Sequence, residues 1–231
     1  MDISADRTLL ASAGIEGTIK FWDSATGAAK GDLKGHNYAV YALAFSPDGR
    51  WLASAGKDRV ILVWDLKSRA IKYEISGHEK AISALKFSPD SRMLASGGEA
   101  IRIWNAPAGE PLGVLYAHKG KVLSLDFSAN GQWLASAGVG GVIKLWDFKA
   151  DNSVNLNGAP ESVSKVRFSP DSHWLASGGT DRLIQIWSVD NANFYHQMKG
   201  HEGTVLALDF DADGKTLVSG ARDHKLIFWT Q

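Results

Sequence analysis

Six tryptophans at almost constant spacing constrain this 231-residue chain more than any other feature of its sequence. Each follows an apolar residue at the end of a short β-like run, and successive gaps are 42, 40, 42, 41 and 42 residues: Trp22, Trp64, Trp104, Trp146, Trp187 and Trp229. A period of this length suits four short strands with their turns and exceeds that of a helical-hairpin repeat. We therefore predict one domain over 1–231, built from six units at about 1–34, 35–76, 77–116, 117–157, 158–199 and 200–231.

Each unit is predicted to be a four-stranded antiparallel sheet. In the second unit, strands are expected over 40–45, 51–54, 60–65 and 71–75, and Pro47-Asp48-Gly49 predicts the first turn. In the third strand of every unit, the residues one and three before the tryptophan are apolar, and the residue two before it is polar in four units. This alternation indicates strands, and no stretch of comparable length has helical periodicity.

Such a small sheet cannot bury both of its faces alone. Radial stacking of six copies buries the faces, and closing the stack removes the exposed ends. The sequence therefore predicts an all-β fold, a β-propeller of about six blades.

The dipeptides around the repeat point to a known family. Gly35-His36 opens the second unit and Trp64-Asp65 closes its third strand, and the same signature recurs at Gly77-His78, Gly200-His201, Trp22-Asp23 and Trp146-Asp147. The chain resembles the WD40-repeat β-propeller family, with the regular repeats of bacterial multi-repeat members. The resemblance covers essentially the whole chain.

This resemblance implies a hydrogen-bonded network of histidine, serine, aspartate and tryptophan within a blade. Two units carry all four residue types: His36, Ser54, Asp58 and Trp64, and His201, Ser219, Asp223 and Trp229. The other units depart from the pattern. The first has Glu16 in place of the aspartate, the third has a turn that is two residues shorter where the aspartate belongs, and the fourth has Gly140 in place of the aspartate. The fifth has Ala159-Pro160 near the position expected for the histidine. We expect the second and sixth blades to be the most rigid, because a buried hydrogen-bonded network contributes much less to stability when some of its members lack partners.

The terminal blades are expected to be incomplete. The first unit starts at the tail of its inner strand and is therefore expected to lack that strand, and the last unit ends after its third strand, without an outer one. A six-bladed, imperfectly sealed arrangement is the favoured interpretation. A piece of a longer propeller, and completion of the edges by a second copy in a homo-oligomer, are the alternatives.

Composition removes several classes of partner. Lys plus Arg and Asp plus Glu both total 25, so the chain has no electrostatic reason to coat nucleic acid or an anionic membrane. No apolar run approaches the roughly 18 residues of a membrane span, and no secretory signal opens the sequence. With no cysteine, disulfides and thiol chemistry are excluded. We expect a cytoplasmic protein without nucleic-acid or membrane partners.

No catalytic, cofactor-binding or metal-binding residue is predicted, and the protein is expected not to be an enzyme. Four histidines recur at repeat spacing, which places one in each of several blades, whereas ligands of one metal must converge. The serines lack the Gly-x-Ser-x-Gly elbow of a nucleophile. The repeated aspartates belong to turns.

The function predicted from the resemblance is that of a scaffold that binds a protein or peptide at the channel mouth. The residues expected there begin the first strands or lie in the turns between the second and third strands: Tyr41, Lys57, Lys121, Leu123, Val139, Thr180, Thr204, Leu206 and Arg222. The basic side chains among them favour a partner segment with some acidic character. Two alternatives are a regulatory or sensor module of a larger protein, such as one fused to a kinase or NTPase, and an enzyme with a site at the channel mouth.

Overall fold

The computed structural model describes residues 1–116, 118–157 and 162–230. These residues form strands and turns and contain no helix, so none could cross a membrane as an apolar helix. The all-β prediction is confirmed. Residues 1–116 and 117–231 form two compact units, each with three antiparallel sheets that we number as blades one to six in chain order.

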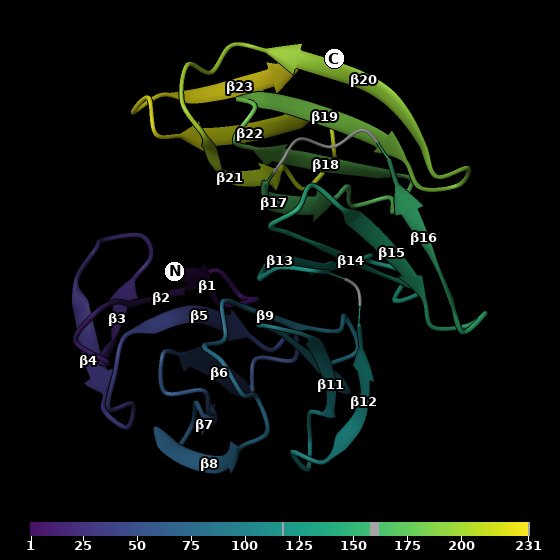
Figure 1. The fold of residues 1–231 in the computed structure, drawn as a ribbon. Helices are drawn as coiled ribbons and strands as arrows, with labels where there is room; N and C mark the ends of the chain where they lie inside the picture. The colour runs from purple at the N-terminus through teal and green to yellow at the C-terminus, as the bar shows by residue number, and fades with distance from the viewer. Residues whose placement is uncertain (117, 158–161, 231) are drawn as a thin grey trace. The chain divides into compact units, whose positions relative to one another are not determined.

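The strands of every blade follow one another in chain order across the sheet (Figure 1). The first unit holds β1 (Asp2–Ile3), β2 (Leu9–Ala13), β3 (Ile19–Asp23) and β4 (Ala29–Leu33); β5 (Val40–Phe45), β6 (Trp51–Gly56), β7 (Ile61–Asp65) and β8 (Ala70–Ile75); and β9 (Ala84–Phe87), β10 (Met93–Gly97), β11 (Ile101–Asn105) and β12 (Pro111–Leu115). The second unit holds β13 (Val122–Phe127), β14 (Trp133–Gly138), β15 (Ile143–Asp147) and β16 (Asn152–Leu156); β17 (Val163–Phe168), β18 (Trp174–Gly179), β19 (Leu183–Ser188) and β20 (Asn193–Lys199); and β21 (Val205–Phe210), β22 (Thr216–Ala221) and β23 (Leu226–Thr230). These are six propeller blades, as predicted.

The terminal blades differ from each other. In blade six, β21, β22 and β23 form a three-stranded sheet, as expected. The expectation that blade one lacks an inner strand is wrong, because β1 pairs with Leu10 and Ala11 of β2. This inner strand is only two residues long, since the tail of the strand is enough to form two pairs.

The apolar core lies between neighbouring blades of each unit. Ile19 and Phe21 of β3 pack in one cluster with Phe45, Leu52 and Trp64 of blade two, and all five are buried. The alternation seen in the sequence produces this arrangement, because residues one and three before each tryptophan point to the same side of the third strand.

A carboxylate on an inner strand also ties neighbouring blades together. The Asp2 Oδ2 atom accepts a hydrogen bond of 2.7 Å from the Phe45 amide of blade two. At the same position of blade four, Asp126 Oδ2 accepts one of 2.8 Å from the Phe168 amide of blade five. Blades therefore make directional contacts as well as apolar ones.

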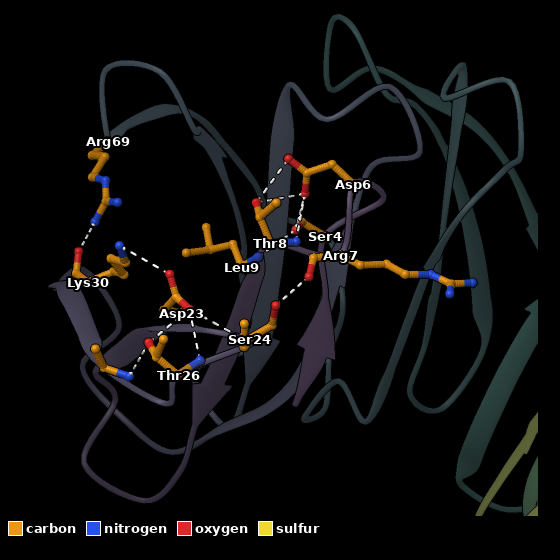
Figure 2. Close-up of polar contacts among 12 residues, drawn as sticks. Ser4, Asp6, Arg7, Thr8, Leu9, Asp23, Ser24, Thr26, Lys30 and Arg69 are labelled. Atoms are coloured by element: carbon orange, nitrogen blue, oxygen red, sulfur yellow. Dashed lines mark hydrogen bonds and ion pairs between the residues drawn. The ribbon is translucent and has the colours of Figure 1, made fainter.

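The aspartates that recur in the first turn of several blades stabilise that turn. In blade one (Figure 2), the Ser4 hydroxyl donates to Asp6 Oδ1 at 2.6 Å, and the amides of Thr8 and Leu9 donate to Asp6 and Ser4. Ser46 and Asp48 make the same contact in blade two, also at 2.6 Å. These aspartates satisfy the backbone of a tight turn, which agrees with the sequence interpretation.

A close backbone approach makes Gly56 a sensitive position at the end of β6. A Cβ atom there would lie 2.0 Å from the Ala39 carbonyl oxygen, whereas a Cβ on Gly14, the equivalent residue of blade one, meets nothing within 4 Å. Gly56→Ala is expected to lower the free energy of unfolding by about 1–3 kcal/mol, because the inner strand must move. Ala221 occupies this position in blade six, so such movement is feasible there.

Urea unfolding followed by tryptophan fluorescence measures this difference, and Gly14→Ala is the matched control. We expect the control to be neutral or stabilising by up to about 1 kcal/mol, since it restricts only the unfolded chain. Equal losses in the two variants would contradict the role of the close approach.

Candidate functional site

Four side chains of blade two form a continuous hydrogen-bonded chain. The Trp64 indole N–H donates to Ser54 Oγ at 2.8 Å, and Ser54 Oγ lies 2.7 Å from His36 Nε2. On the other side of the ring, His36 Nδ1 lies 2.6 Å from Asp58 Oδ2 and must donate to it, because a carboxylate only accepts. The chain links the third strand, the second strand, the residue pair that opens the unit, and the turn before the third strand.

Blade six repeats this geometry. His201 lies 2.7 Å from Ser219 Oγ and 2.9 Å from Asp223 Oδ2, and Trp229 donates to Ser219 at 2.7 Å. Burial opposes ionisation of Asp223, but hydrogen bonds from the Glu202 amide and from His201 outweigh it and hold the pKa of Asp223 below its ordinary value. The carboxylate therefore stays charged and fixes the turn.

The serine–histidine–aspartate arrangement is that of a catalytic triad, but its chemistry differs. Ser54 is fully buried and its oxygen already accepts the indole N–H, so no substrate carbonyl can reach it. A nucleophile needs an accessible oxygen beside an oxyanion site. The geometry of this network suits holding a turn against two strands.

The inner strands carry a repeated bulge that places one residue apart from the ladder. In β5, β13, β17 and β21, the pairing register shifts around one residue in each strand: Tyr41, Leu123, Ser164 and Leu206. Such bulges redirect side chains. Nothing in the sequence signals these bulges directly, although Tyr41, Leu123 and Leu206 are among the predicted partner-binding residues.

A backbone hydrogen bond joins each of these strands to the turn after the second strand. In unit one, the Lys57 amide donates to the Ala39 carbonyl at 2.9 Å. In unit two, the amides of Val139, Thr180 and Arg222 donate at 3.0 Å to the carbonyls of Lys121, Ser162 and Thr204. The predicted residues are thus brought together blade by blade. Blades four and five are further linked by pairing of Val139 with Ser162.

Most of the predicted partner-binding side chains are accessible. The large apolar ones are about half exposed, with values of 50% for Tyr41, 47% for Val139 and 49% for Leu206. Lys57, Lys121, Thr180 and Arg222 are exposed, and Leu123 and Thr204 are intermediate. In unit one, the Lys57 ammonium also lies 5.8 Å from the centre of the Tyr38 ring. Each unit therefore presents apolar, hydroxyl and basic side chains on or beside turns that are held by backbone hydrogen bonds.

A comparison with protein-family models identifies the repeat. The model described as WD40, WD domain, G-beta repeat, matches six stretches that together span nearly the whole chain: residues 1–23, 27–65, 70–105, 109–147, 152–188 and 192–230. The chain belongs to the WD40 family. Propellers of this family are typical protein-interaction scaffolds and are generally non-catalytic.

The third WD40 repeat corrects one expectation. It was expected to lack the acid of the network, but Glu99 supplies a carboxylate 3.3 Å from His78 Nδ1. His78 also contacts Ser96 at 2.7 Å, and Trp104 donates to Ser96 at 2.8 Å. The longer side chain of glutamate compensates for the shorter turn, so the signal was present in the sequence one residue earlier than the aspartate position.

The remaining WD40 repeats hold only part of the network. In repeats one and five, the tryptophan contacts its serine at 2.8 Å, through Trp22 with Ser12 and Trp187 with Ser177. Burial raises the pKa of Asp181, the acid of repeat five. Ala159-Pro160, which the sequence places near the missing histidine, lies outside the described residues.

In repeat four, the His118 Nε2 atom lies 2.9 Å from Ser136 Oγ. The buried Nδ1 atom of His118 has no hydrogen-bond partner among the described residues, because Gly140 stands in place of the acid. Burial and the nearby Lys144 lower the pKa of His118 from 6.5 to about 4. The folded state therefore favours neutral His118, so the unfolded state binds more protons between these values.

We accordingly expect the stability contributed by neutral His118 to be present above pH 6.5 and to be lost as the pH falls from 6.5 towards 4. His118→Gln, which cannot titrate, should make the free energy of unfolding less dependent on pH in this window. Urea unfolding of both proteins at several pH values tests this. Parallel pH curves would contradict it, since the other histidines are common to both proteins.

Across residues 1–116, 118–157 and 162–230, no three His, Asp or Glu side chains lie close enough together to hold a metal ion. The four repeat histidines instead lie within their own blades, each beside its own serine.

Proposed function

We propose that this protein is a non-catalytic interaction scaffold, which binds a protein or peptide through the ends of its inner strands and the turns that follow its second strands. The proposal treats the repeats as one cytoplasmic interaction domain that needs no cofactor. The observation that carries it is the repeated bulge beside a hydrogen-bonded turn, which presents a different exposed or partly exposed side chain at the same edge of blades two, four, five and six.

Preorganisation supports binding at this edge. In blades two, four, five and six the amide of the turn already donates to the carbonyl just before the inner strand, and in blades two and six an aspartate of the turn is also hydrogen-bonded to a buried histidine. A partner would therefore order little backbone on the protein side, which lowers the entropic cost of association.

The side chains favour a mixed apolar and acidic partner segment. Tyr41 and Leu206 offer half-exposed apolar area, and Lys57, Lys121 and Arg222 offer positive charge. Aromatic and arginine side chains dominate the energetics of many interfaces. The balanced net charge of the whole chain gives no support to a nucleic-acid ligand.

A capture experiment with cross-linking tests the proposal. Partners recovered by wild type are compared with those of Tyr41→Ala/Lys121→Glu/Arg222→Glu, and the affinity of each recovered partner is then measured. A matched control reverses two exposed charges in the turns that follow the third strands, at the other end of the blades, in Lys67→Glu/Lys149→Glu. We expect the triple variant to lose partners that the control keeps. Retention of the same partners at unchanged affinity would refute binding at this edge.

A further inference from the structure

One ring nitrogen of His118 in blade four is a buried polar atom without a hydrogen-bond partner among the described residues. Ser136 Oγ accepts the Trp146 indole N–H at 3.0 Å and lies 2.9 Å from His118 Nε2, so the serine hydroxyl can donate to Nε2. In the neutral ring the hydrogen then lies on Nδ1, as in blade two. His118 Nδ1 is therefore a donor that lacks an acceptor.

Three other blades show what this nitrogen binds. The facing carboxylate lies 2.6 Å from Nδ1 in blade two, 2.9 Å in blade six and 3.3 Å in blade three, and is supplied by Asp58, Asp223 and Glu99. Gly140 stands at this position in blade four, where it is exposed, and a Cβ atom on it would meet nothing within 4 Å. Blade four thus has open space on the side where the other blades carry an acid.

Blade three shows which groups surround such a carboxylate. Besides His78 Nδ1, the Glu99 carboxylate accepts the Glu79 amide at 3.2 Å and lies 3.9 Å from Arg102 Nη2. Blade four keeps an imidazole, a backbone amide and a cation at the same three positions: His118, Lys119 and Lys144. The groups that hold a carboxylate are therefore present in blade four without the acid itself.

The charge beside His118 also favours an anion. The Lys144 ammonium lies 4.8 Å from the centre of the Trp146 ring, within the same network. Lys144 acts on His118 as well, since its positive charge contributes to the lowered pKa of that ring. A carboxylate placed at His118 Nδ1 would gain a hydrogen bond and the attraction of this ammonium.

The network of blade four is open to solvent more than its counterparts. His36, His78 and His201 are buried, whereas His118 and Trp146 are partly exposed. The Nδ1 atom itself is covered, so a ligand must displace the adjacent turn slightly. Gly140 and Gly141, with φ values of +99° and +69°, form that turn, and glycine changes conformation at low steric cost.

We propose that blade four binds an aspartate or glutamate side chain of the partner segment, whose carboxylate accepts the His118 Nδ1–H as Asp58 accepts that of His36. This inference rests on the proposed function, because Val139, next to Gly140, belongs to the predicted partner-binding edge. It assigns the acidic character of the partner to one position in one blade.

Acetate is the probe for this site, and NMR of the His118 imidazole in the 231-residue chain follows its binding. At an ionic strength held constant with chloride, we expect acetate to shift the His118 resonances saturably. It should also raise the pKa of His118, because an adjacent carboxylate favours the imidazolium. His36 and His201 already contact aspartates and are internal controls that should shift much less.

Gly140→Asp supplies the carboxylate from the chain itself. The turn has the same length as in blade two, where Asp58 has no positive φ, so the variant can adopt that conformation. We expect the pKa of His118 to rise above about 5 without acetate, and the affinity for acetate to fall at least about tenfold.

Two further variants complete this test. Ala129→Asp adds the same charge to an exposed turn at the opposite end of blade four, and should bind acetate within about twofold of wild type. Lys144→Gln leaves the glycine turn unchanged and removes the cation, and should weaken acetate binding at least about threefold. His118 resonances that respond to acetate no more than to chloride would overturn the inference.

The partners recovered by wild type provide the second test. We expect Gly140→Asp to lower their affinity at least about tenfold and Ala129→Asp to leave it unchanged within about twofold. Partners lost by Tyr41→Ala/Lys121→Glu/Arg222→Glu but kept at full affinity by Gly140→Asp would overturn this inference and leave the proposed function standing. Partners kept by both variants would refute the proposed function and this inference with it.

Discussion

Ser54→Ala is expected to lower the free energy of unfolding by about 2–4 kcal/mol, because one hydroxyl serves two buried partners. Ser54 Oγ accepts the Trp64 indole N–H at 2.8 Å and lies 2.7 Å from His36 Nε2. All three side chains are buried, so water cannot replace the lost contacts. The indole donor and the imidazole nitrogen would both remain unsatisfied.

Ser12→Ala in blade one is the matched control for this prediction. Ser12 accepts the Trp22 indole N–H at 2.8 Å, and both residues are only partly buried. We expect a loss of about 1 kcal/mol, the value of a single ordinary hydrogen bond. Urea denaturation of the two variants gives the comparison. Similar losses in blades one and two would show that the complete network adds nothing beyond its tryptophan–serine contact.

The blades could be predicted from the sequence because two patterns agree. The tryptophan period gives the length of one blade, and the alternation of apolar residues gives the strands within it. Ile19 and Phe21 illustrate this, since both were assigned to one strand face and both pack against blade two. The tail of the inner strand of blade one is recognisable in the sequence, but two residues give no alternation from which pairing with the second strand could be predicted. The pairs Asp2 with Ala11 and Ile3 with Leu10 are visible only in three dimensions.

The polar network was predictable where side chains follow the family spacing, and less so where length compensates for spacing. Glu99 reaches His78 from a turn that is shorter than the family pattern requires. Counting positions along the sequence therefore does not identify Glu99 as the acid of the network. The bulges at Tyr41 and Leu206 were also hidden. A bulge changes which residues face each other across two strands, and it leaves the apolar sequence of either strand unaltered.

A pocket between blades five and six, lined by Trp174, Tyr195 and Trp229 among others, could not be predicted from the sequence because it depends on how two blades pack. Trp174 looks like Trp51 and Trp133 in the sequence, and all three begin a second strand. Only the structure shows that the latter two pack with residues of the following blade, whereas Trp174 lines an open pocket. Equivalent residues therefore differ in their surroundings, although they occupy the same place in the repeat.

The junction between blades four and five depends on a buried carboxylate, and its removal is the second large effect that we expect. Asp126 is almost fully buried, its Oδ2 atom accepts the Phe168 amide at 2.8 Å, and its Oδ1 atom lies 3.2 Å from Arg167 Nη1. Asp126→Ala should lower the free energy of unfolding by about 2–4 kcal/mol, because a buried amide and part of a guanidinium lose their acceptor.

Asp209 occupies the same position in blade six and provides the matched control. Its side chain is 70% exposed, lies 3.1 Å from Arg167 Nε and accepts the Phe210 amide at 3.1 Å, so Asp209→Ala removes an ion pair and a hydrogen bond at the surface but no contact with the backbone of another blade. Such pairs contribute about 0–1 kcal/mol. Urea unfolding should separate the two variants clearly, and hydrogen exchange should show faster exchange of the Phe168 amide in Asp126→Ala alone. If both substitutions cost the same, the carboxylate acts through Arg167 and not through the backbone of the next blade, and the directional contact between these blades is unimportant.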